Sequence, residues 1–190
     1  MIETLDTNKI PKIKLKSGRE IHSIGMGTFG SDRYTPDDVS AAVRSAINYG
    51  YRFFDCASVY GNEDNIGNVF EDALYSGIVK RSDLFVTSKL WNDMHGPGKV
   101  HISFFKSLHD LGLSYIDAYF LHWPFPNYHA PGCDGNSRNP DSVPFSVNRF
   151  MDTWKQLEEI YESGLTHHLG MSNMTIPKLE AVLPHCKTKP

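Results

Sequence analysis

Three observations in this chain of 190 residues predict an α/β fold, a TIM (β/α)8 barrel. Short apolar segments alternate with segments of helical periodicity at intervals of about 30 residues, which is typical of a parallel sheet covered by helices. Four successive apolar segments end in a polar residue of a catalytic type, and in a barrel such positions meet at the carboxyl rim. The glycines of Gly25–Gly30 do not lead directly into a helix, so the sequence departs from the dinucleotide-binding Rossmann fingerprint.

The composition is that of one ordinary globular domain spanning residues 1–190. Hydrophobic residues make up 40% of the chain and charged residues 22%, which is enough for one sizeable core. A net charge of −3 gives no basic footprint and argues against nucleic acid as a partner. No apolar run approaches the roughly 20 residues of a bilayer-spanning helix, and the N-terminal segment is polar. We therefore expect a cytoplasmic protein that does not bind a membrane.

The cysteines and histidines predict neither disulfides nor a metal site. Cys56, Cys133 and Cys186 are odd in number and show no C-x-x-C spacing, which predicts reduced thiols. We expect Cys56 in the core and Cys133 in an exposed loop without a function. None of the nine histidines belongs to an H-x-x-x-H or H-E-x-x-H pattern.

The chain opens with a predicted β-hairpin at 13–22 and a short strand at 23–27. The hairpin is indicated by two short strands around a turn that contains Gly18. Thr35 then precedes a proline and two acids, and these signals begin a helix that ends at Gly50.

The second strand–helix unit carries the first chemical signal. Residues 51–54 form a short aromatic run that ends at Asp55, and apolar residues then keep helical spacing up to Gly77. Two acids near the start of this helix, Glu63 and Asp64, are interpreted as its solvated first turn.

The third and fourth units repeat this arrangement. Residues 84–88 form a strand that ends at Lys89, and the helix that follows closes at Gly112. Residues 116–121 form the next strand, which ends at His122. The strands of the second, third and fourth units therefore end in an acid, a lysine and a histidine, respectively.

A long loop at 123–146, rich in proline, asparagine, glycine and serine, precedes the last predicted helices and strand. After the next helix, residues 168–171 form a short strand that ends at Ser172. Pro177 opens a last helix. The five βα units together span residues 23–186.

Asp55, Tyr60, Lys89 and His122 suggest a site that polarises and protonates a carbonyl group. A tyrosine has an unperturbed pKa of about 10, and a nearby ammonium lowers it by favouring the phenolate. With a carboxylate holding that ammonium, Tyr60 becomes a general acid and His122 can orient the same oxygen. No activated nucleophile is evident, so a hydride-carrying cofactor has to complete the chemistry. Singly, each residue would more often be a cap, an ion pair or a packing residue; together they favour catalysis.

Five motifs resemble the aldo-keto reductase family, in order and at suitable spacing. They are GMGTFG, GYRFFDCASVYGNEDNIG, LFVTSKLWN, YFLHWP and LGMSN, and the match covers nearly the whole chain. The resemblance, which is to aldose and xylose reductase-like members, implies a barrel whose floor is closed by the N-terminal hairpin. It implies reduction of a small-molecule aldehyde or ketone with NADP(H), or with NAD(H). By this resemblance Tyr60 is the proton donor, and Lys89 and Asp55 tune the acidity of Tyr60. His122 orients the carbonyl group of the substrate.

The resemblance also implies contacts with cofactor and substrate. Ser172 and Asn173 match the pair that binds the nicotinamide carboxamide, while Gly27 and Thr28 lie where the cofactor passes the first strand. Asp55 is assigned to the cofactor site as well. Read alone, Ser172-Asn173 could also be an N-cap signal for the last helix, although cofactor contact is favoured. The tryptophans of the motifs are equally plain packing residues. The side chains implied for the substrate pocket are Phe29, Trp91, His122 and Trp123.

The chain departs from the family in length. The family has eight βα units, about 250 residues in a typical barrel, and five are found here. In the family, the later strands supply a glutamine and a stacking aromatic residue for the nicotinamide, and a later segment supplies basic residues for the 2′-phosphate. These have no counterpart within the 190 residues.

Three functions therefore stay open. The first is an NADP(H)-dependent carbonyl reductase that is monomeric or weakly oligomeric. The second is a truncated, non-catalytic chain with a binding or regulatory role, which could self-associate through an exposed barrel edge. The third is a redox sensor that uses its bound cofactor to act on another protein.

Overall fold

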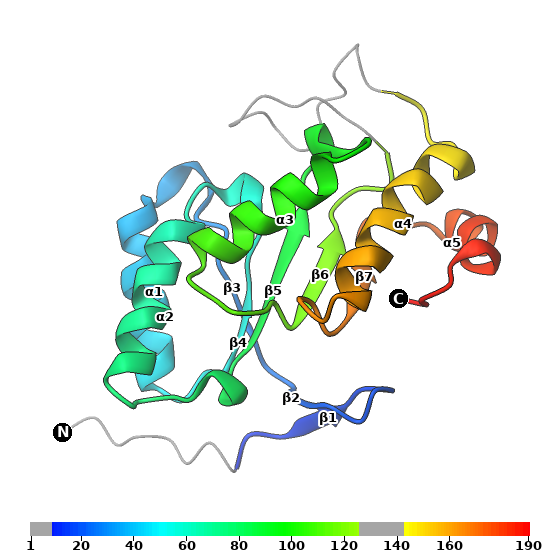
Figure 1. The fold of residues 1–190 in the computed structure, drawn as a ribbon. Helices are drawn as coiled ribbons and strands as arrows, with labels where there is room; N and C mark the ends of the chain where they lie inside the picture. Colours follow the sequence, from blue (N-terminus) through cyan, green and yellow to red (C-terminus); the bar gives the residue numbers. More distant parts are fainter. Residues whose placement is uncertain (1–8, 126–142) are drawn as a thin grey trace.

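The computed structural model describes residues 9–125 and 143–190, and its centre is a parallel sheet of five strands (Figure 1). The strand order β3-β4-β5-β6-β7 follows the sequence, as expected when each strand is joined to the next by a helix. Gly27 pairs with Asp55, and Asp55 pairs with Thr87. The strands are β3 (Met26–Gly27), β4 (Phe53–Asp55), β5 (Phe85–Leu90), β6 (Ala118–Leu121) and β7 (Leu169–Met171).

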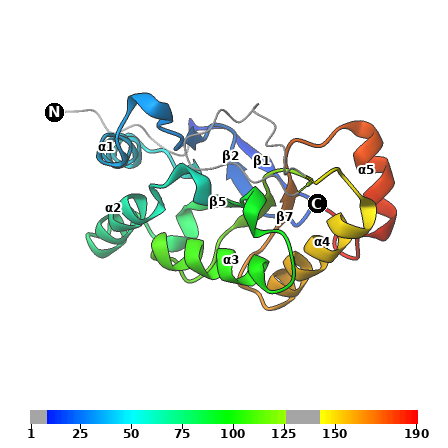
Figure 2. The same ribbon diagram turned by 90° about the horizontal axis from the view of Figure 1, so that it is seen from above.

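The α-helices of the described residues lie on the outer side of the sheet and form an arc when seen from above (Figure 2). Two side chains at the start of the first helix determine where this helix begins. The Thr35 side chain accepts a hydrogen bond from the backbone N–H of Asp38, and the Asp38 carboxylate accepts one from the backbone of Thr35. The helices are α1 (Pro36–Asn48), α2 (Glu63–Tyr75), α3 (Lys99–Asp110), α4 (Val147–Glu162) and α5 (Ile176–Val182).

The hydrophobic core lies between the helices and the outer face of the sheet. Because side chains alternate along a strand, Phe54, Val86 and Tyr119 share this face, and all three are fully buried. Trp154 of α4 is fully buried as well. The rings of Phe104 and Tyr119 meet edge to face, with centroids 5.0 Å apart. The alternation sends the intervening side chains to the inner face, where the polar residues predicted for the site lie.

Gly67 lets α2 approach the end of α3. A Cβ atom at this position would lie 2.1 Å from the carbonyl oxygen of Asp110 and 3.0 Å from the Cα of Leu111. Both are backbone atoms, which cannot rotate away as a flexible side chain can. The two helices therefore require a residue without a side chain at this crossing.

The hairpin lies below the amino ends of the strands (Figure 1). The hydroxyl of Ser17 lies 2.7 Å from a ring nitrogen of His168. The guanidinium group of Arg19 donates to the carbonyl of Ser82 at 2.8 Å and forms an ion pair with Asp117 at 3.8 Å. These contacts fasten the hairpin to three loops at the floor of the sheet. The two antiparallel strands of the hairpin are β1 (Lys12–Lys14) and β2 (Glu20–His22).

The inner face of the sheet also carries an apolar groove. Phe53, Phe85 and Phe120 line a groove of about 690 Å³ that also includes Leu15 of the hairpin. Among the described residues, β3 and β7 each pair with a strand on one side only. The sheet, its helices and its floor therefore form part of an α/β barrel, as the sequence predicts.

The predicted elements are all found, and some of their ends differ. The strand expected at 23–27 is limited to Met26–Gly27, and the last helix begins at Ile176, one residue before Pro177. Cys133 and most of the loop predicted at 123–146 lie outside the described residues. The assignment of residues 1–190 to a single domain stays a prediction.

Replacing Gly67 by alanine tests the close approach of α2 and α3. In an ordinary helix this change stabilises by about 1 kcal/mol. Here the added methyl group overlaps backbone atoms, so the free energy of unfolding should fall by about 1–3 kcal/mol. Urea denaturation followed by circular dichroism measures it, with Ser45→Ala on the exposed side of α1 as the control. A Gly67→Ala variant at least as stable as the parent would contradict the packing described.

Candidate active site

Asp55, Lys89 and His122 lie at the carboxyl ends of three neighbouring strands. Asp55 is the last residue of β4, Lys89 is next to the last residue of β5, and His122 directly follows β6. Because strand side chains alternate between the two faces, Asp55 and Lys89 both point to the inner side. Tyr60 reaches the same place from the 3-10 turn Ser58–Tyr60, which follows β4.

The Lys89 ammonium group joins these residues. Its Nζ donates to Asp55 Oδ2 at 2.8 Å, to the carbonyl of Cys56 at 2.9 Å and to the Tyr60 hydroxyl at 3.3 Å. Lys89 is only 8% exposed, and a buried charge is unfavourable unless it is paired and hydrogen-bonded. An ammonium has three N–H donors, so the three acceptors satisfy it and hold it between the acid and the phenol.

Thr87 holds the second carboxylate oxygen of Asp55. Its Oγ1 donates to Asp55 Oδ1 at 2.6 Å. Thr28, which directly follows β3, donates from its hydroxyl at 3.0 Å and from its backbone at 3.1 Å to the Asp55 carbonyl. Thr87 is not among the residues predicted for the site, although its place two residues before Lys89 puts it on the same face of the strand.

The pKa of the Tyr60 phenol is raised. Burial has the largest effect, and the charge and hydrogen bond of Lys89 oppose it. Lys89 does lower the pKa of Tyr60, as expected. The expected net decrease is wrong, because burial raises this pKa by more than Lys89 lowers it. A phenol with a raised pKa keeps its proton at neutral pH, which is the state that a proton donor requires.

His122 is neutral at neutral pH. Burial, and then the positive charge of Lys89, lower its pKa to about 4, while Asp55 acts in the opposite direction. Its Nδ1 atom is buried and has no hydrogen-bond partner among the described residues. Its ring meets that of Tyr60 edge on, with centroids 6.0 Å apart. A neutral imidazole beside the phenol can donate an N–H to the oxygen that the phenol protonates.

Ser172 and Asn173 are fastened to the end of β6. Asn173 has a left-handed backbone with φ of 57°. Its Nδ2 donates to the His122 carbonyl at 2.8 Å and to the Ser172 hydroxyl at 3.3 Å. The N-cap of α5 is Thr175, so the alternative in which Ser172-Asn173 cap this helix is wrong. The pair instead lies beside the site.

The segment that follows β3 lies against Tyr60. Thr28 is buried, and its carbonyl accepts a hydrogen bond from Asn62 Nδ2 at 2.8 Å. The next residue, Phe29, is 66% exposed, and its ring centroid lies 5.1 Å from that of Tyr60. Apart from Gly27 and its two chain neighbours, no heavy atom of the described residues lies within 4 Å of the position that a Cβ would take at Gly27. This segment therefore has an open backbone at Gly27 and an exposed aromatic ring at the rim.

The two tryptophans predicted for the substrate pocket differ in their contacts. The ring centroid of Trp91 lies 5.0 Å from that of His122, at an interplanar angle of 76°. The ring of Trp123 lies against Phe125, with centroids 6.2 Å apart. The structure thus brings Trp91 into contact with a candidate catalytic residue, whereas the ring contact of Trp123 is with its own loop.

Glu63 is buried, contrary to the expectation of a solvated first turn. It is 4% exposed, and it accepts hydrogen bonds from the hydroxyls of Ser88 at 2.5 Å and Ser107 at 2.7 Å. Burial raises its pKa against these two hydrogen bonds. The spacing in the sequence could have indicated this burial, because Glu63 precedes Ile66 by three residues on the apolar face of the helix. Because Ser88 precedes Lys89, this contact fixes the start of α2 against β5 close to the site.

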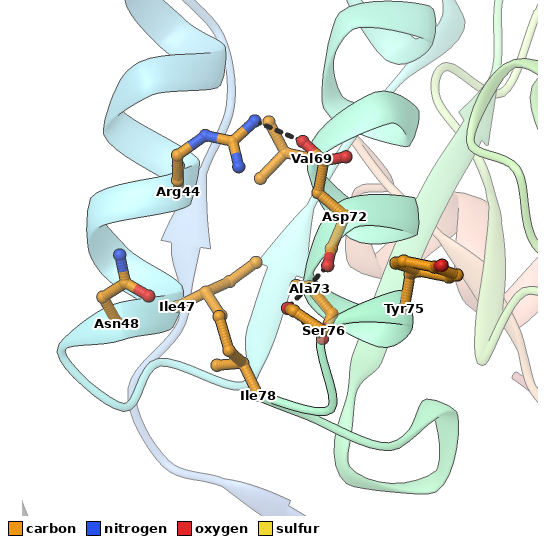
Figure 3. A pocket seen from close by; sticks show the side chains of 9 residues that line it. All are labelled: Arg44, Ile47, Asn48, Val69, Asp72, Ala73, Tyr75, Ser76 and Ile78. Carbon is orange, nitrogen blue, oxygen red and sulfur yellow. Dashed lines mark hydrogen bonds and ion pairs between the residues drawn. The ribbon is translucent and has the colours of Figure 1, made fainter.

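A separate hollow of about 330 Å³ lies between α1 and α2 (Figure 3). Arg44 and Asp72 form an ion pair of 2.8 Å across it. Ile47 and Val69 supply apolar walls (Figure 3). The hollow contains none of the candidate catalytic residues and is a packing gap between two surface helices.

Across residues 9–125 and 143–190, no three His, Cys, Asp or Glu side chains are grouped so that they could hold a metal ion. No helix in this part of the chain is both long enough and apolar enough to span a bilayer. Cys56 is fully buried, as expected, and burial raises the pKa of its thiol.

Glu63→Gln tests the buried carboxyl group. Because its pKa is raised on folding, the folded protein binds this proton more tightly than the unfolded chain does. The stabilising contribution of Glu63 is therefore complete below the unfolded pKa near 4.5 and is lost as the pH rises through the folded pKa. Relative to Glu63→Gln, the parent protein should be less stable at pH 8 than at pH 4.

Urea denaturation of both proteins across this pH range measures the difference in the free energy of unfolding. Glu71→Gln, at an exposed position on the same helix, controls for the loss of one negative charge. A difference between parent and Glu63→Gln that stays constant from pH 4 to pH 8 would show that the carboxyl group has no raised pKa.

Comparison with known proteins places these residues in a family. A family model described as the aldo/keto reductase family matches residues 23–190. An aldo/keto reductase of Synechocystis sp. is 39% identical over 183 residues, which cover 96% of this chain and 54% of that protein. The chain therefore spans about half the length of the curated relatives that it matches.

Two solved structures share the fold. An aldo-keto reductase of Bombyx mori in complex with NADP matches with a TM-score of 0.81 and 32% identity, over 95% of this chain and 56% of that one. The aldose reductase from Schistosoma japonicum matches with a TM-score of 0.81 and 40% identity, over 95% of this chain and 59% of that one. These likenesses confirm the partial barrel. With its family model, its motifs and its fold in agreement, the chain belongs to the aldo/keto reductase family.

Proposed function

We propose that this chain carries the proton-delivering part of an NADP(H)-dependent reductase that converts an aldehyde or ketone into an alcohol. The observation that carries the proposal is the Lys89 ammonium, which contacts both the Asp55 carboxylate and the Tyr60 hydroxyl. The relative from Bombyx mori, whose structure is a complex with NADP, supports the class of cofactor.

Tyr60 is the proton donor in this proposal. Its phenol keeps its proton until a carbonyl oxygen gains enough negative charge to accept it. The phenolate left behind lies 3.3 Å from Lys89 Nζ, and Asp55 holds that ammonium at 2.8 Å. The lysine therefore stabilises the phenolate more than the phenol, so its help grows as the proton leaves. Neutral His122 donates a second hydrogen bond to the same oxygen.

NADP(H) supplies the hydride for the carbonyl carbon when it is bound, and NAD(H) is the alternative carrier. The residues present fit the amide end of such a cofactor. Asn173 is held in place by the His122 carbonyl and lies beside the Ser172 hydroxyl. The free space at Gly27 lets a ligand pass close to the backbone. We assign cofactor contacts to Gly27, Thr28, Asp55, Ser172 and Asn173.

The rim aromatic residues support a small organic carbonyl compound as the substrate. Phe29 lies beside Tyr60, and Trp91 lies beside His122, so both stand next to the groups that handle the carbonyl oxygen. Their rings offer apolar surface for the rest of the substrate. Trp123 extends this surface along the following loop. The free thiols of Cys56 and Cys186 support a cytoplasmic location.

A second candidate is a non-catalytic chain that binds a partner or a second copy of itself. The apolar groove of about 690 Å³ on the inner face favours it. So do β3 and β7, each of which has a strand partner on one side only among the described residues. The reductase, by contrast, is proposed to be a monomer or a weak oligomer. Tight binding of NADPH by the 190-residue chain counts against the second candidate.

Tyr60→Phe tests the assigned proton donor. Removal of a general acid typically lowers turnover about 10²- to 10⁴-fold, so kcat for NADPH oxidation with a reactive aldehyde should fall at least about 100-fold. The Kd for NADPH, measured by fluorescence, should stay within about twofold, because the ring remains in place. Tyr75→Phe is the matched control, since Tyr75 is 94% exposed on α2.

Two results would contradict this proposal. One is a Tyr60→Phe variant that keeps the turnover of the parent. The other is a parent protein that binds NADPH but oxidises it with no reactive aldehyde, which would favour a redox sensor that keeps its cofactor bound.

A further inference from the structure

A hollow of about 620 Å³ lies between the hairpin and the amino ends of β4 and β5. Arg52, in its wall, directly precedes β4, whose last residue is Asp55. The hollow and the candidate active site are therefore at opposite ends of the same strands. Its charged and imidazole side chains are Lys12, Arg19, Glu20, His22, Arg52 and Asp83.

The hairpin concentrates positive charge in a chain whose net charge is −3. Residues 9–22 contain four lysines and an arginine but a single carboxylate, that of Glu20. Among the described residues, the ion pair found for this segment is that of Arg19 with Asp117, at 3.8 Å. No carboxylate in the part of the chain that the structure describes therefore neutralises the lysine charges at ion-pair distance. They are Lys9, Lys12, Lys14 and Lys16.

Lys12 and His22 are directly opposite each other in the hairpin, so their side chains share one face. Burial, and then the positive charges of Lys12 and Arg52, lower the pKa of His22. Its Nδ1 atom is buried and has no hydrogen-bond partner among the described residues. Two cationic side chains and an imidazole in the wall of one hollow are an arrangement that a bound anion would satisfy.

Arg52 is held rigidly at the wall of the hollow. One of its guanidinium nitrogens donates to the carbonyl of Ile47 at 2.9 Å and to that of Tyr51 at 2.8 Å. A guanidinium group has five N–H donors, so others are left for a ligand. The carboxylate of Asp83 attracts Arg52 but also accepts a hydrogen bond from the backbone of Lys80 at 2.9 Å.

We propose that this hollow binds a small phosphorylated molecule, with Lys12, His22 and Arg52 contacting its phosphate oxygens. An ammonium, a guanidinium and an imidazole N–H are hydrogen-bond donors, and a phosphate group presents three acceptor oxygens. The volume lies within the range of roughly 300–1,000 Å³ that is usual for small-molecule sites. A hollow of this size suits a free molecule better than it suits the flat surface of a membrane.

Titration of the 190-residue chain with inorganic pyrophosphate, followed by NMR of backbone amides, tests the site. The amide signals of residues 12–22 and of Arg52 should shift and saturate. Lys12→Glu should weaken the Kd about tenfold, the size expected for the loss of one charge-assisted hydrogen bond. Arg52→Gln is a poorer test, because it also removes hydrogen bonds to two backbone carbonyls.

Lys155→Glu is the matched control, since Lys155 is exposed on α4 and the charge change is the same. It should keep the parent Kd within about twofold. No saturable shift near the hairpin at about 10 mM pyrophosphate would overturn the proposal. An equal loss of affinity in Lys12→Glu and Lys155→Glu would overturn it too, because it would mark attraction by overall charge. Saturable binding with selective loss in Lys12→Glu supports the site, whether or not the chain reduces carbonyl compounds.

Discussion

The buried ammonium group of Lys89 is the constraint on which the candidate site depends. A charge with this little exposure has to find acceptors, and it finds them on Asp55, Cys56 and Tyr60. The side chain of Asp55 is 42% exposed, so water moderates this ion pair. The same contacts that satisfy the ammonium place a phenol, a carboxylate and a lysine within hydrogen-bond reach of one another. Folding of this region and assembly of the site are therefore one process.

Strand β5 connects the site to the fold behind it through both of its faces. Thr87 and Lys89 point inward to Asp55, while Ser88 between them points outward to the buried carboxylate of Glu63. The segment that carries Tyr60 thus lies between two anchors, its contact with Lys89 and the start of α2. These anchors give the phenol a defined position before any ligand binds, which is what general acid catalysis requires.

Residues at strand ends could be predicted from the sequence because their position follows from topology. Asp55, Lys89 and His122 each follow a short apolar run, and parallel strands bring such ends to one rim. The net pKa shift of Tyr60 could not be predicted, because burial decides it and burial depends on the whole fold. Glu63 was misjudged for a similar reason: its spacing on the helix was visible, but its partners lie on other elements.

Local ambiguity left other points open in the sequence. Ser172-Asn173 before a helix is a capping signal in any sequence, and the left-handed backbone of Asn173, which ties the pair to His122, is visible only in three dimensions. Trp123 belongs to a family motif and its ring lies against Phe125, so its place in the substrate pocket stays a prediction. Motif spacing therefore located the site, while the direction of individual side chains needed the structure.

The most direct test of the account is the phenol pKa of Tyr60 in the parent protein and in Lys89→Met. It can be followed by NMR of tyrosine labelled at Cζ, with the signal assigned by its loss in Tyr60→Phe. Since Lys89 lowers this pKa against the effect of burial, the account predicts a higher pKa in Lys89→Met. An unchanged or lower pKa would show that the ammonium does not act on the phenol, and would contradict the account.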